Sequence, residues 1–438
     1  MPSLPYFFSM TKPTSTTFVP GPINPQRVIS DLRELAALTS TPDGAQRVAW
    51  GPVWRQAREW FKGKVKELGL TVETDSSGNN WVKLPGVSDK AVIVAGHLDS
   101  VPNGGWLDGC LGVLSGLEAL RRYAGGEKPP VTMWLVDWAD EEGARFGRSL
   151  VGSSAAGGSL HPDEELAHLV DRAGTKLPDA LRENGVELGS MLNAHAELKS
   201  RGAEAYLELH IEQGPVLESM KKPTGVVLGT FGVERHSIRF TGQAAHSGST
   251  PIPMRRDAFL AAAEFALACR KIGLKHSGKS PEKRVVSTCG VVKVEPCIVT
   301  AVPGVCEISL DQRALSAKVL AKMYAAAKKA SKKAAKKNNV KVEWKRIWQI
   351  EPRPFDPTLV ALCEEAVKKA TGSAPRLPSG PLHDAAEMVP HMPTVMMFAY
   401  SSNGLSHCKE EDTPEKHLAK TIHAFLLLAE KTVNHLAG

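Results

Sequence analysis

The stretch AVIVAGHLDSVPNGGWLDGCLGVLSGLEALRRY (91–123) decides the fold class of this chain. Its first six residues form a continuous apolar run, which is typical of a strand buried on both faces of a sheet. From Asp108 onward, Leu and Val recur at helical spacing, and the acidic residue suits the start of a helix. A second apolar run, VTMWLVDWA (131–139), follows. Strands that alternate with helices predict an α/β layer around a mostly parallel sheet.

Local patterns on the N-terminal side of this layer predict further elements. Residues 24–40 and 50–68 carry apolar positions at helical spacing, which predicts two helices. Residues 71–75 and 79–84 alternate on either side of a Ser-Ser-Gly turn, as the strands of a hairpin do.

The pattern changes near residue 225. A strongly alternating stretch is followed by a helix, two strand segments and a Lys-rich helix, at 225–248, 257–273, 284–296, 304–314 and from Ser316. The order β-α-β-β-α predicts a small α+β sheet with its helices on one face. The predicted fold class is therefore α/β: a catalytic domain with a mixed, largely parallel sheet flanked by helices, interrupted by an inserted α+β domain.

The domain boundaries follow from these changes. We predict a disordered tail at 1–20, a catalytic domain at 21–231 and 350–438, and an inserted domain at 232–349. The first 20 residues hold one Lys and no Arg, which does not suit a signal or transit peptide. They are a disordered tail, or they lie upstream of a working start at Met10.

The composition excludes several classes of protein. Of 438 residues, 42% are hydrophobic and 23% are charged, as in ordinary globular proteins of about two domains. No apolar run reaches the ~18 residues of a membrane-spanning helix. The seven cysteines are scattered without a CxxC pair. This pattern argues against disulfides or a thiolate zinc site, and we expect a cytoplasmic protein.

The net charge of +7 has a local source in residues 328–346. The lysines of this helix fall at i, i+1, i+4 and i+5, so they form one solvated face opposite Ala and Met. They are Lys328, Lys329, Lys332, Lys333, Lys336 and Lys337. We favour a plain exposed face over a site for an anionic partner. Nucleic-acid binding would want interleaved aromatic residues, so no such partner is expected.

Five short segments carry histidines and carboxylates at spacings that suit a hydrolytic site with two metal ions. They are GHLDS (96–100), WLDGCLG (106–112), ADEEGARF (139–146), ELHIEQG (208–214) and GLSHCKEE (404–411). One residue from each gives three imidazoles and two carboxylates: His97, Asp108, Glu142, His210 and His407. Glu141 is left to act as a base.

The residue types support this grouping. Asp99 stands two residues after His97 at a strand end, where its carboxylate can orient the imidazole. Asp108 can bridge two ions with its two oxygens. Glu141 and Glu142 are adjacent carboxylates, which need a cation or a shared proton to coexist. We assign Glu142 to a metal ion and Glu141 to proton transfer from the attacking water.

Mixed histidine and carboxylate ligation suits two divalent ions, Zn²⁺ or Mn²⁺, with Co²⁺ or Ni²⁺ as alternatives. Each segment alone is a weak signal, since most HxD pairs are structural and most adjacent glutamates are surface residues. Their joint occurrence at strand ends and Gly-rich turns favours a functional site. We expect the other histidines to be structural or surface residues: His161, His168, His195, His236, His276, His391, His417, His423 and His435.

These segments resemble those of the hydantoinase/carbamoylase amidohydrolases, in the di-metal aminoacylase and carboxypeptidase clan. The resemblance rests on residues 96–121, 136–155, 207–218, AAHSGSTP (244–251) with RRDA (255–258), and SSNGLSHCKEE (401–411). HIEQG discriminates best, because the broader clan has Asp or Glu where this chain has His210. The resemblance implies that the five residues named above are the metal ligands, with Asp108 bridging, and that Glu141 is the general base.

The resemblance also implies substrate contacts. Gln213 matches a substrate-contacting residue of the HIEQG segment, and His383 matches the histidine of the family's HDA motif near the substrate. Arg313, in LDQRA, matches an arginine that holds the substrate carboxylate, for which a guanidinium fork is suited. His246 matches a histidine of the inserted domain that stabilises the transition state when the domains close. That domain also forms the dimer interface in the family, so a homodimer is expected.

Two departures from the family pattern fall where the substrate carboxylate should lie. Thr300, in TAVP, replaces the usual Asn. Leu382, before HDA, replaces the usual Gly. Both affect which acid is recognised, while the metal chemistry is unchanged. Ile252, for the usual Met, is conservative.

The expected activity is metal-dependent hydrolysis of the N-carbamoyl (ureido) group of N-carbamoyl-L-amino acids to amino acid, ammonia and carbon dioxide. N-carbamoyl-β-alanine, allantoate and ureidoglycolate are the alternative ureido substrates. An aminoacylase or dipeptidase of the same clan would use the same ions on an acyl amide. A non-catalytic binding protein would need a broken site, and the complete set of ligands argues against it.

Overall fold

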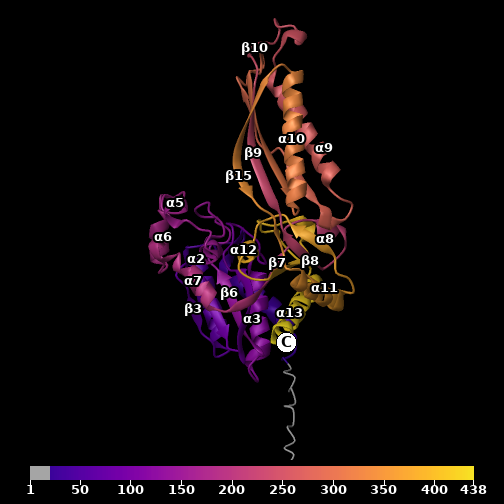
Figure 1. Ribbon diagram of the computed structural model, residues 1–438. Coiled ribbons are helices and arrows are strands. Elements are labelled where there is room, and N and C mark those ends of the chain that lie inside the picture. The colour runs from indigo at the N-terminus through magenta and orange to yellow at the C-terminus, as the bar shows by residue number, and fades with distance from the viewer. Residues whose placement is uncertain (1–19) are drawn as a thin grey trace, which may run out of the picture.

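The computed structural model describes residues 20–438, so the predicted tail, apart from Pro20, lies outside the described residues. Two main β-sheets carry the fold, one above the other in Figure 1. Among residues 20–438, every helix is too short or too polar to span a bilayer.

The larger sheet has nine strands in the order β16-β8-β18-β7-β5-β6-β4-β3, with β17 beside β8. Their bounds are β3 Val72–Thr74, β4 Asn80–Leu84, β5 Ser88–His97, β6 Val131–Trp138, β7 Ala203–Ile211, β8 Thr224–Thr230, β16 Arg353–Pro354, β17 Arg376–Ser379 and β18 Thr394–Ala399. The central strands β6, β5, β7 and β18 pair in parallel, whereas β4 and β8 pair antiparallel on either side. The predicted mixed sheet is confirmed, with its parallel pairs mainly in the centre.

Helices surround this sheet, as predicted. They are α1 Pro25–Thr39, α2 Pro52–Lys66, α3 Cys110–Ala124, α4 Val151–Gly157, α5 Pro162–Glu165, α6 Leu177–Glu183, α7 Asn193–Ser200, α8 Val216–Ser219, α11 Pro357–Thr371, α12 Asp384–Met388 and α13 Glu415–Ala437. α3 lies against β5, β6 and β7, and α13 packs on α1, α3 and α11. A small hairpin, β1 Ser40–Thr41 with β2 Gly44–Ala45, follows α1.

Two glycines let α3 begin close to the sheet. Gly109 has φ 67°, and a Cβ there would lie 2.3 Å from ring atoms of His97. At Gly112 a Cβ would lie 2.6 Å from the carbonyl oxygen of Ala95 in β5. Side chains at either position would push the helix away. The glycines therefore hold Asp108, two residues before α3, against the end of β5.

The second sheet is antiparallel, in the order β11-β14-β9-β15, with β12 also paired to β14. Its elements are β9 Gly232–Thr241, α9 Ala258–His276, β11 Val285–Thr288, β12 Val292–Glu295, β14 Val305–Ala314, α10 Ala317–Lys337 and β15 Lys341–Ile350. Both helices pack on one face, where alternate residues of β14 are buried. The other face carries partly exposed side chains, Asp311 and Arg313 among them.

The second sheet has its own apolar core, which includes Phe240, Phe265 and Leu310. The domain boundaries remain a prediction; the sheet itself runs from Gly232 to Ile350. At its far end from the larger sheet, β10 (Ala245–His246) pairs with β13 (Ala301–Val302) (Figure 1).

Candidate metal centre

Four adjacent parallel strands bring the histidine and carboxylate segments together. His97 is the last residue of β5 and His210 lies one residue before the end of β7. Glu142 and His407 lie in the loops that follow β6 and β18, and Asp108 lies just before α3. The carboxyl ends of parallel strands meet at one edge of a sheet, where α/β proteins bind their ligands.

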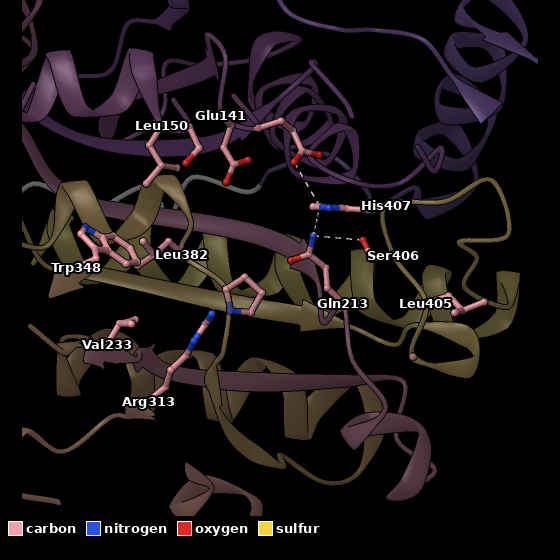
Figure 2. Close-up of a pocket in the computed structure, with 14 residues that line it drawn as sticks. Glu141, Leu150, Gln213, Val233, Arg313, Trp348, Leu382, Leu405, Ser406 and His407 are labelled. Atoms are coloured by element: carbon pink, nitrogen blue, oxygen red, sulfur yellow. Dashed lines mark hydrogen bonds and ion pairs between the residues drawn. The ribbon is translucent and has the colours of Figure 1, made fainter. Parts of the chain in front are cut away.

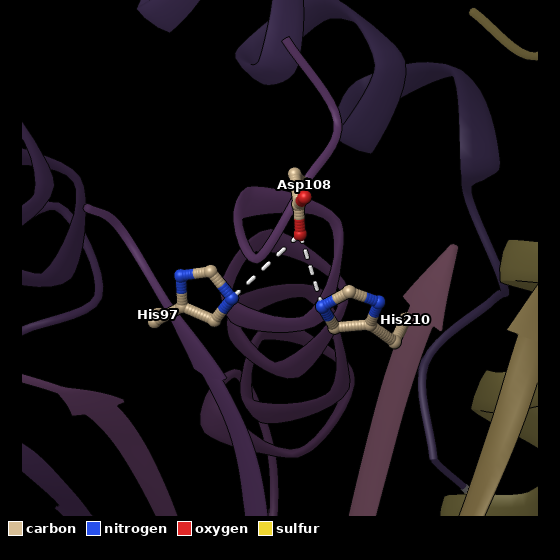
Figure 3. Close-up of side chains that lie close together, drawn as sticks. All are labelled: His97, Asp108 and His210. Carbon is tan, nitrogen blue, oxygen red and sulfur yellow. Dashed lines mark ion pairs between the residues drawn. The ribbon is translucent and has the colours of Figure 1, made fainter. Parts of the chain in front are cut away.

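A first group of ligand atoms consists of His97, Asp108 and His210 (Figure 3). Asp108 Oδ1 lies 3.0 Å from His210 Nε2 and 3.8 Å from His97 Nε2. All three side chains are buried. The two imidazoles therefore face the same carboxylate oxygen from two neighbouring strands.

A second group consists of Asp108, Glu142 and His407. His407 Nε2 lies 3.3 Å from Glu142 Oε2 and 3.5 Å from Asp108 Oδ2. Asp108 thus turns one oxygen to each group. This is the arrangement of a carboxylate that bridges two cations.

The unpaired atoms at these positions fit bound cations. Asp108 Oδ1, His97 Nε2 and Glu142 Oε1 are buried and have no hydrogen-bond partner, a costly state unless an ion binds them. His210 Nδ1 lies 2.9 Å from the Ile211 carbonyl oxygen, so its Nε2 carries the free lone pair. Nitrogen and carboxylate donors suit Zn²⁺ or Mn²⁺.

Asp99 orients the residues around it. Its carbonyl oxygen and Oδ1 lie 3.2 and 3.5 Å from His97 Nδ1. Its carboxylate accepts hydrogen bonds from the backbone amides of Glu141 and Glu142 at 3.3 and 3.1 Å. A single buried carboxylate therefore fixes the end of β5 relative to the loop after β6.

Glu141 lies beside the first group, with Oε2 3.8 Å from His97 Nε2. Burial raises the pKa of Glu141 well above its usual range, and the carboxylates of Asp384 and Glu142 add to the shift. Burial and Asp108 likewise raise the pKa of Glu142 well above its usual range. Carboxylates crowded in this way repel one another until cations are present.

Three further polar residues connect Asp108 to the loops after β7 and β18. The sequence predicts a substrate contact for Gln213 and does not single out Ser406 or Glu411. Gln213 Nε2 donates to Asp108 Oδ2 at 2.9 Å. Glu411 Oε1 accepts from the Asp108 amide at 3.1 Å, and its Oε2 accepts from Ser406 Oγ at 2.9 Å. Burial and Asp108 raise the pKa of Glu411 to about 7. Glu411 belongs to the segment GLSHCKEE, but nothing in the sequence of that segment distinguishes it from the exposed Glu410.

The metal residues open into a cavity of about 540 Å³ (Figure 2). Glu141, Glu142, Gln213 and His407 line it together with Arg313 from the second sheet. Arg313 Nε donates to Asp311 Oδ1 and Nη1 to the Gly380 carbonyl oxygen, each at 2.9 Å. Its Nη2 also donates to Asp311 Oδ2 at 3.2 Å. One hydrogen on each Nη is therefore left for a ligand.

Of the two neighbouring residues expected to contact the substrate, Leu382 and His383, only Leu382 lines the cavity. His383 is 1% exposed and packs against His210, with ring centres 4.3 Å apart and ring planes tilted by 53°. Burial, with His210 beside it, holds the pKa of His383 well below its usual range. His383 is thus buried beside the His210 imidazole and is not among the residues that line the cavity.

His246 and Thr300 are not brought to the cavity in this structure. They lie on and beside the β10–β13 pair at the distal end of the second sheet, and both are exposed (Figure 1). His246 Nδ1 accepts hydrogen bonds from the amides of Gly248 and Ser249 at 3.1 and 3.2 Å. The neutral ring therefore carries its proton on Nε2.

Strained backbone gathers around the cavity. Asp140, Leu150 and Gln213 have φ 57°, and His407 has φ 59°. Such left-handed conformations are costly for residues other than glycine and cluster at functional sites.

Known proteins match this chain over most of its length. The pattern of peptidase family M20/M25/M40 matches residues 93–431. The N-carbamoyl-L-amino acid amidohydrolase of Geobacillus stearothermophilus is 33% identical over 403 residues, covering 89% of this chain and 94% of that one. The allantoate amidohydrolase of Escherichia coli is 30% identical, with 92% and 97% covered.

A solved structure agrees with these relatives. The hydantoinase/carbamoylase family amidase from Burkholderia multivorans superposes with a TM-score of 0.82 at 31% identity, covering 93% of this chain and 97% of that one. The family resemblance inferred from the five segments is confirmed. The chain belongs to peptidase family M20/M25/M40, among its hydantoinase/carbamoylase members, and is a hydrolase.

Proposed function

We propose that this protein hydrolyses the N-carbamoyl group of N-carbamoyl-L-amino acids to amino acid, ammonia and carbon dioxide. The observation that carries the proposal is the pair of ligand groups that share Asp108, with Glu141 beside them, at a cavity that also contains Arg313. The relative named for this activity is 33% identical to the chain, against 30% for the allantoate enzyme.

Two divalent ions, Zn²⁺ or Mn²⁺, are the proposed cofactors, with the two groups around Asp108 as their ligands. When bound, such ions polarise the carbonyl under attack and make water more acidic. Glu141 takes a proton from the attacking water and delivers it to the leaving nitrogen. The carbon–nitrogen bond then breaks, ammonia leaves, and the remaining carbamate loses carbon dioxide.

Two residues are proposed to anchor the substrate. The Nη hydrogens of Arg313 bind its carboxylate as a fork, and the amide of Gln213 contacts its polar end. Leu382, which lines the cavity, tunes which acid is accepted, and Thr300 does so once the distal end of the second sheet closes on the substrate. His383 supports the His210 ring against which it packs. His246 Nε2 donates a hydrogen bond to the developing oxyanion. This contact requires the domains to close, so that the distal end of the second sheet reaches the metal ligands.

A homodimer through the second sheet is also proposed. α9 exposes a row of large apolar side chains, of which Leu267 and Leu274 are 63% and 65% exposed, and Val292 on the edge strand β12 is 50% exposed. Apolar surface of this kind commonly marks an interface.

A cytoplasmic location is proposed as well. All seven cysteines are free, which supports this location.

The test is turnover by protein reconstituted with Zn²⁺ or Mn²⁺, followed as ammonia release from ureido acids and as amine release from N-acyl amino acids. Glu141→Gln should lower kcat by about 10²- to 10⁴-fold, because the proton acceptor is lost, while metal content stays unchanged. Glu410→Gln, an exposed neighbour of the metal loop, is the matched control and should remain active. Cleavage of acyl amides alone, without ureido acids, would refute the proposal.

A further inference from the structure

One end of the metal-site cavity is apolar. Figure 2 shows Leu150, Trp348 and Leu382 together at this end, next to Glu141, with Val233 below them. His407 and Gln213 lie toward the other end. Leu150 and Val233 are buried, at 5% and 1% exposed, whereas Trp348 is 39% exposed.

The Trp348 ring is held in place by a row of paired residues across the open face of the second sheet. Asp311 of β14 pairs with Arg235 of β9, which pairs with Trp348 of β15. Arg235 Nε donates to Asp311 Oδ2 at 2.9 Å, and its guanidinium carbon lies 5.3 Å from the Trp348 ring centre. A cation over an aromatic face fixes the ring.

The same row reaches the proposed carboxylate site. Asp311 also accepts from Arg313 Nε at 2.9 Å. The indole and the Arg313 guanidinium are thus positioned by one shared carboxylate. A ligand that binds both would meet them at a fixed separation, without ordering flexible side chains on binding.

From these contacts we propose that Leu150, Val233, Trp348 and Leu382 form a subsite for the substrate side chain, and that this side chain is large and apolar. The inference rests on the proposed function, which places the ureido group at the metal ligands and the carboxylate at Arg313. The third substituent of the α-carbon then meets the apolar end of the cavity.

This subsite disfavours the smaller and more polar ureido acids. Allantoate carries a second ureido group on the same carbon, and ureidoglycolate carries a hydroxyl. Either group would lose its hydrogen bonds to water against leucine and valine, at a cost of about 1–3 kcal/mol per unpaired group. N-carbamoylglycine and N-carbamoyl-β-alanine would leave the subsite unfilled.

The experiment compares kcat/KM for N-carbamoyl-L-phenylalanine, N-carbamoyl-L-leucine, N-carbamoylglycine, N-carbamoyl-L-aspartate and allantoate on metal-loaded enzyme. We expect the first two to exceed the others by about 10-fold or more, as filling an apolar pocket does. Trp348→Ala should lower the phenylalanine value by about 10- to 100-fold and change the glycine value less than about 2-fold. Trp348→Phe should retain most of the preference.

The neighbouring residue provides the matched control. Ile347 is 55% exposed and lines an adjacent cavity of about 640 Å³ rather than the metal-site cavity. Ile347→Ala should therefore leave the preference unchanged. Because Trp348 is partly exposed, its truncation should not prevent folding; Leu382→Gly provides a second variant that shortens the same wall.

Binding separates failure of this inference from failure of the proposed function. Calorimetric titration of metal-loaded Glu141→Gln protein measures affinity without turnover. Tighter binding of the phenylalanine than the glycine compound, lost in Trp348→Ala, supports the subsite even if no ureido acid is cleaved. Equal binding of the two compounds, or faster cleavage of allantoate or N-carbamoylglycine, overturns it even if ureido acids are cleaved.

Discussion

The edge of the larger sheet and the open face of the second sheet hold their functional residues in different ways. At the edge, His97, Asp108 and His210 are buried, and His97 Nε2 and Asp108 Oδ1 lack a hydrogen-bond partner. On the open face, Arg313 and Arg235 are paired with Asp311, and Trp348 is partly exposed. The ligand atoms of the first region need bound cations to balance their charge. The charged side chains of the second region are already paired with one another, and they can contact a ligand without a bound cation.

This difference indicates a division of labour. Burying ligand atoms without hydrogen-bond partners costs free energy, and the binding of a cation compensates this cost. Paired arginines on a sheet face cost little in the free protein, so they can recognise a substrate without a bound ion. We infer that chemistry belongs to the rigid edge of the larger sheet and recognition to the second sheet.

Replacement of Asp108 should have the largest effect. Asp108→Ala removes the carboxylate that both ligand groups share, so we expect both ions to be lost and turnover to fall to background. His407→Ala should remove only the second ion, because the first group keeps its ligands. Metal content per chain, measured by mass spectrometry, tests this. Two ions retained by Asp108→Ala would contradict a shared carboxylate.

Replacement of His246 should have the next largest effect, without change in metal content. A lost oxyanion donor lowers kcat by about 10²- to 10³-fold, although His246 lies at the distal end of the second sheet in this structure. Steady-state kinetics of His246→Ala, against His435→Ala as an exposed control, measure this. The proposed homodimer is tested separately: light scattering of the unmodified protein should give twice the mass of one chain. Full activity of His246→Ala would remove this residue from the mechanism.

Replacement of Glu411 should have a smaller effect, on metal affinity. Glu411→Gln weakens acceptance from the Asp108 amide and from Ser406 Oγ, and such outer partners contribute about 10- to 100-fold to metal binding. Competition with a chelating dye measures the affinity. Glu410→Gln should not change it. Equal affinities of the two variants would show that Glu411 does not position the site.

Much of the larger sheet was predictable from the sequence. The apolar runs that became β5 and β6 are buried along the sheet centre, because a parallel strand covered on both faces must be apolar throughout. The alternation of β14 and the amphipathic α10 gave the second sheet for a similar reason. The residues predicted as metal ligands from their positions after strands fall into the two candidate ligand groups.

Other parts of the site could not be predicted in this way. Trp348, Leu150 and Val233 are ordinary apolar residues in sequence and meet only where the two sheets approach each other. Glu411 differs from Glu410 only in burial. His383 is buried beside His210, and its depth depends on packing against β7 rather than on its neighbours in sequence; its contact with the substrate stays a prediction.

The sequence alone determined which chemical groups are present and which strand ends carry them, because hydrophobic period and turn residues are local properties. Tertiary structure alone decided that Asp108 serves two ligand groups, that an apolar wall faces Glu141, and that His246 stands far from both. Those relations depend on how strands more than a hundred residues apart pair and on how closely α3 packs against β5.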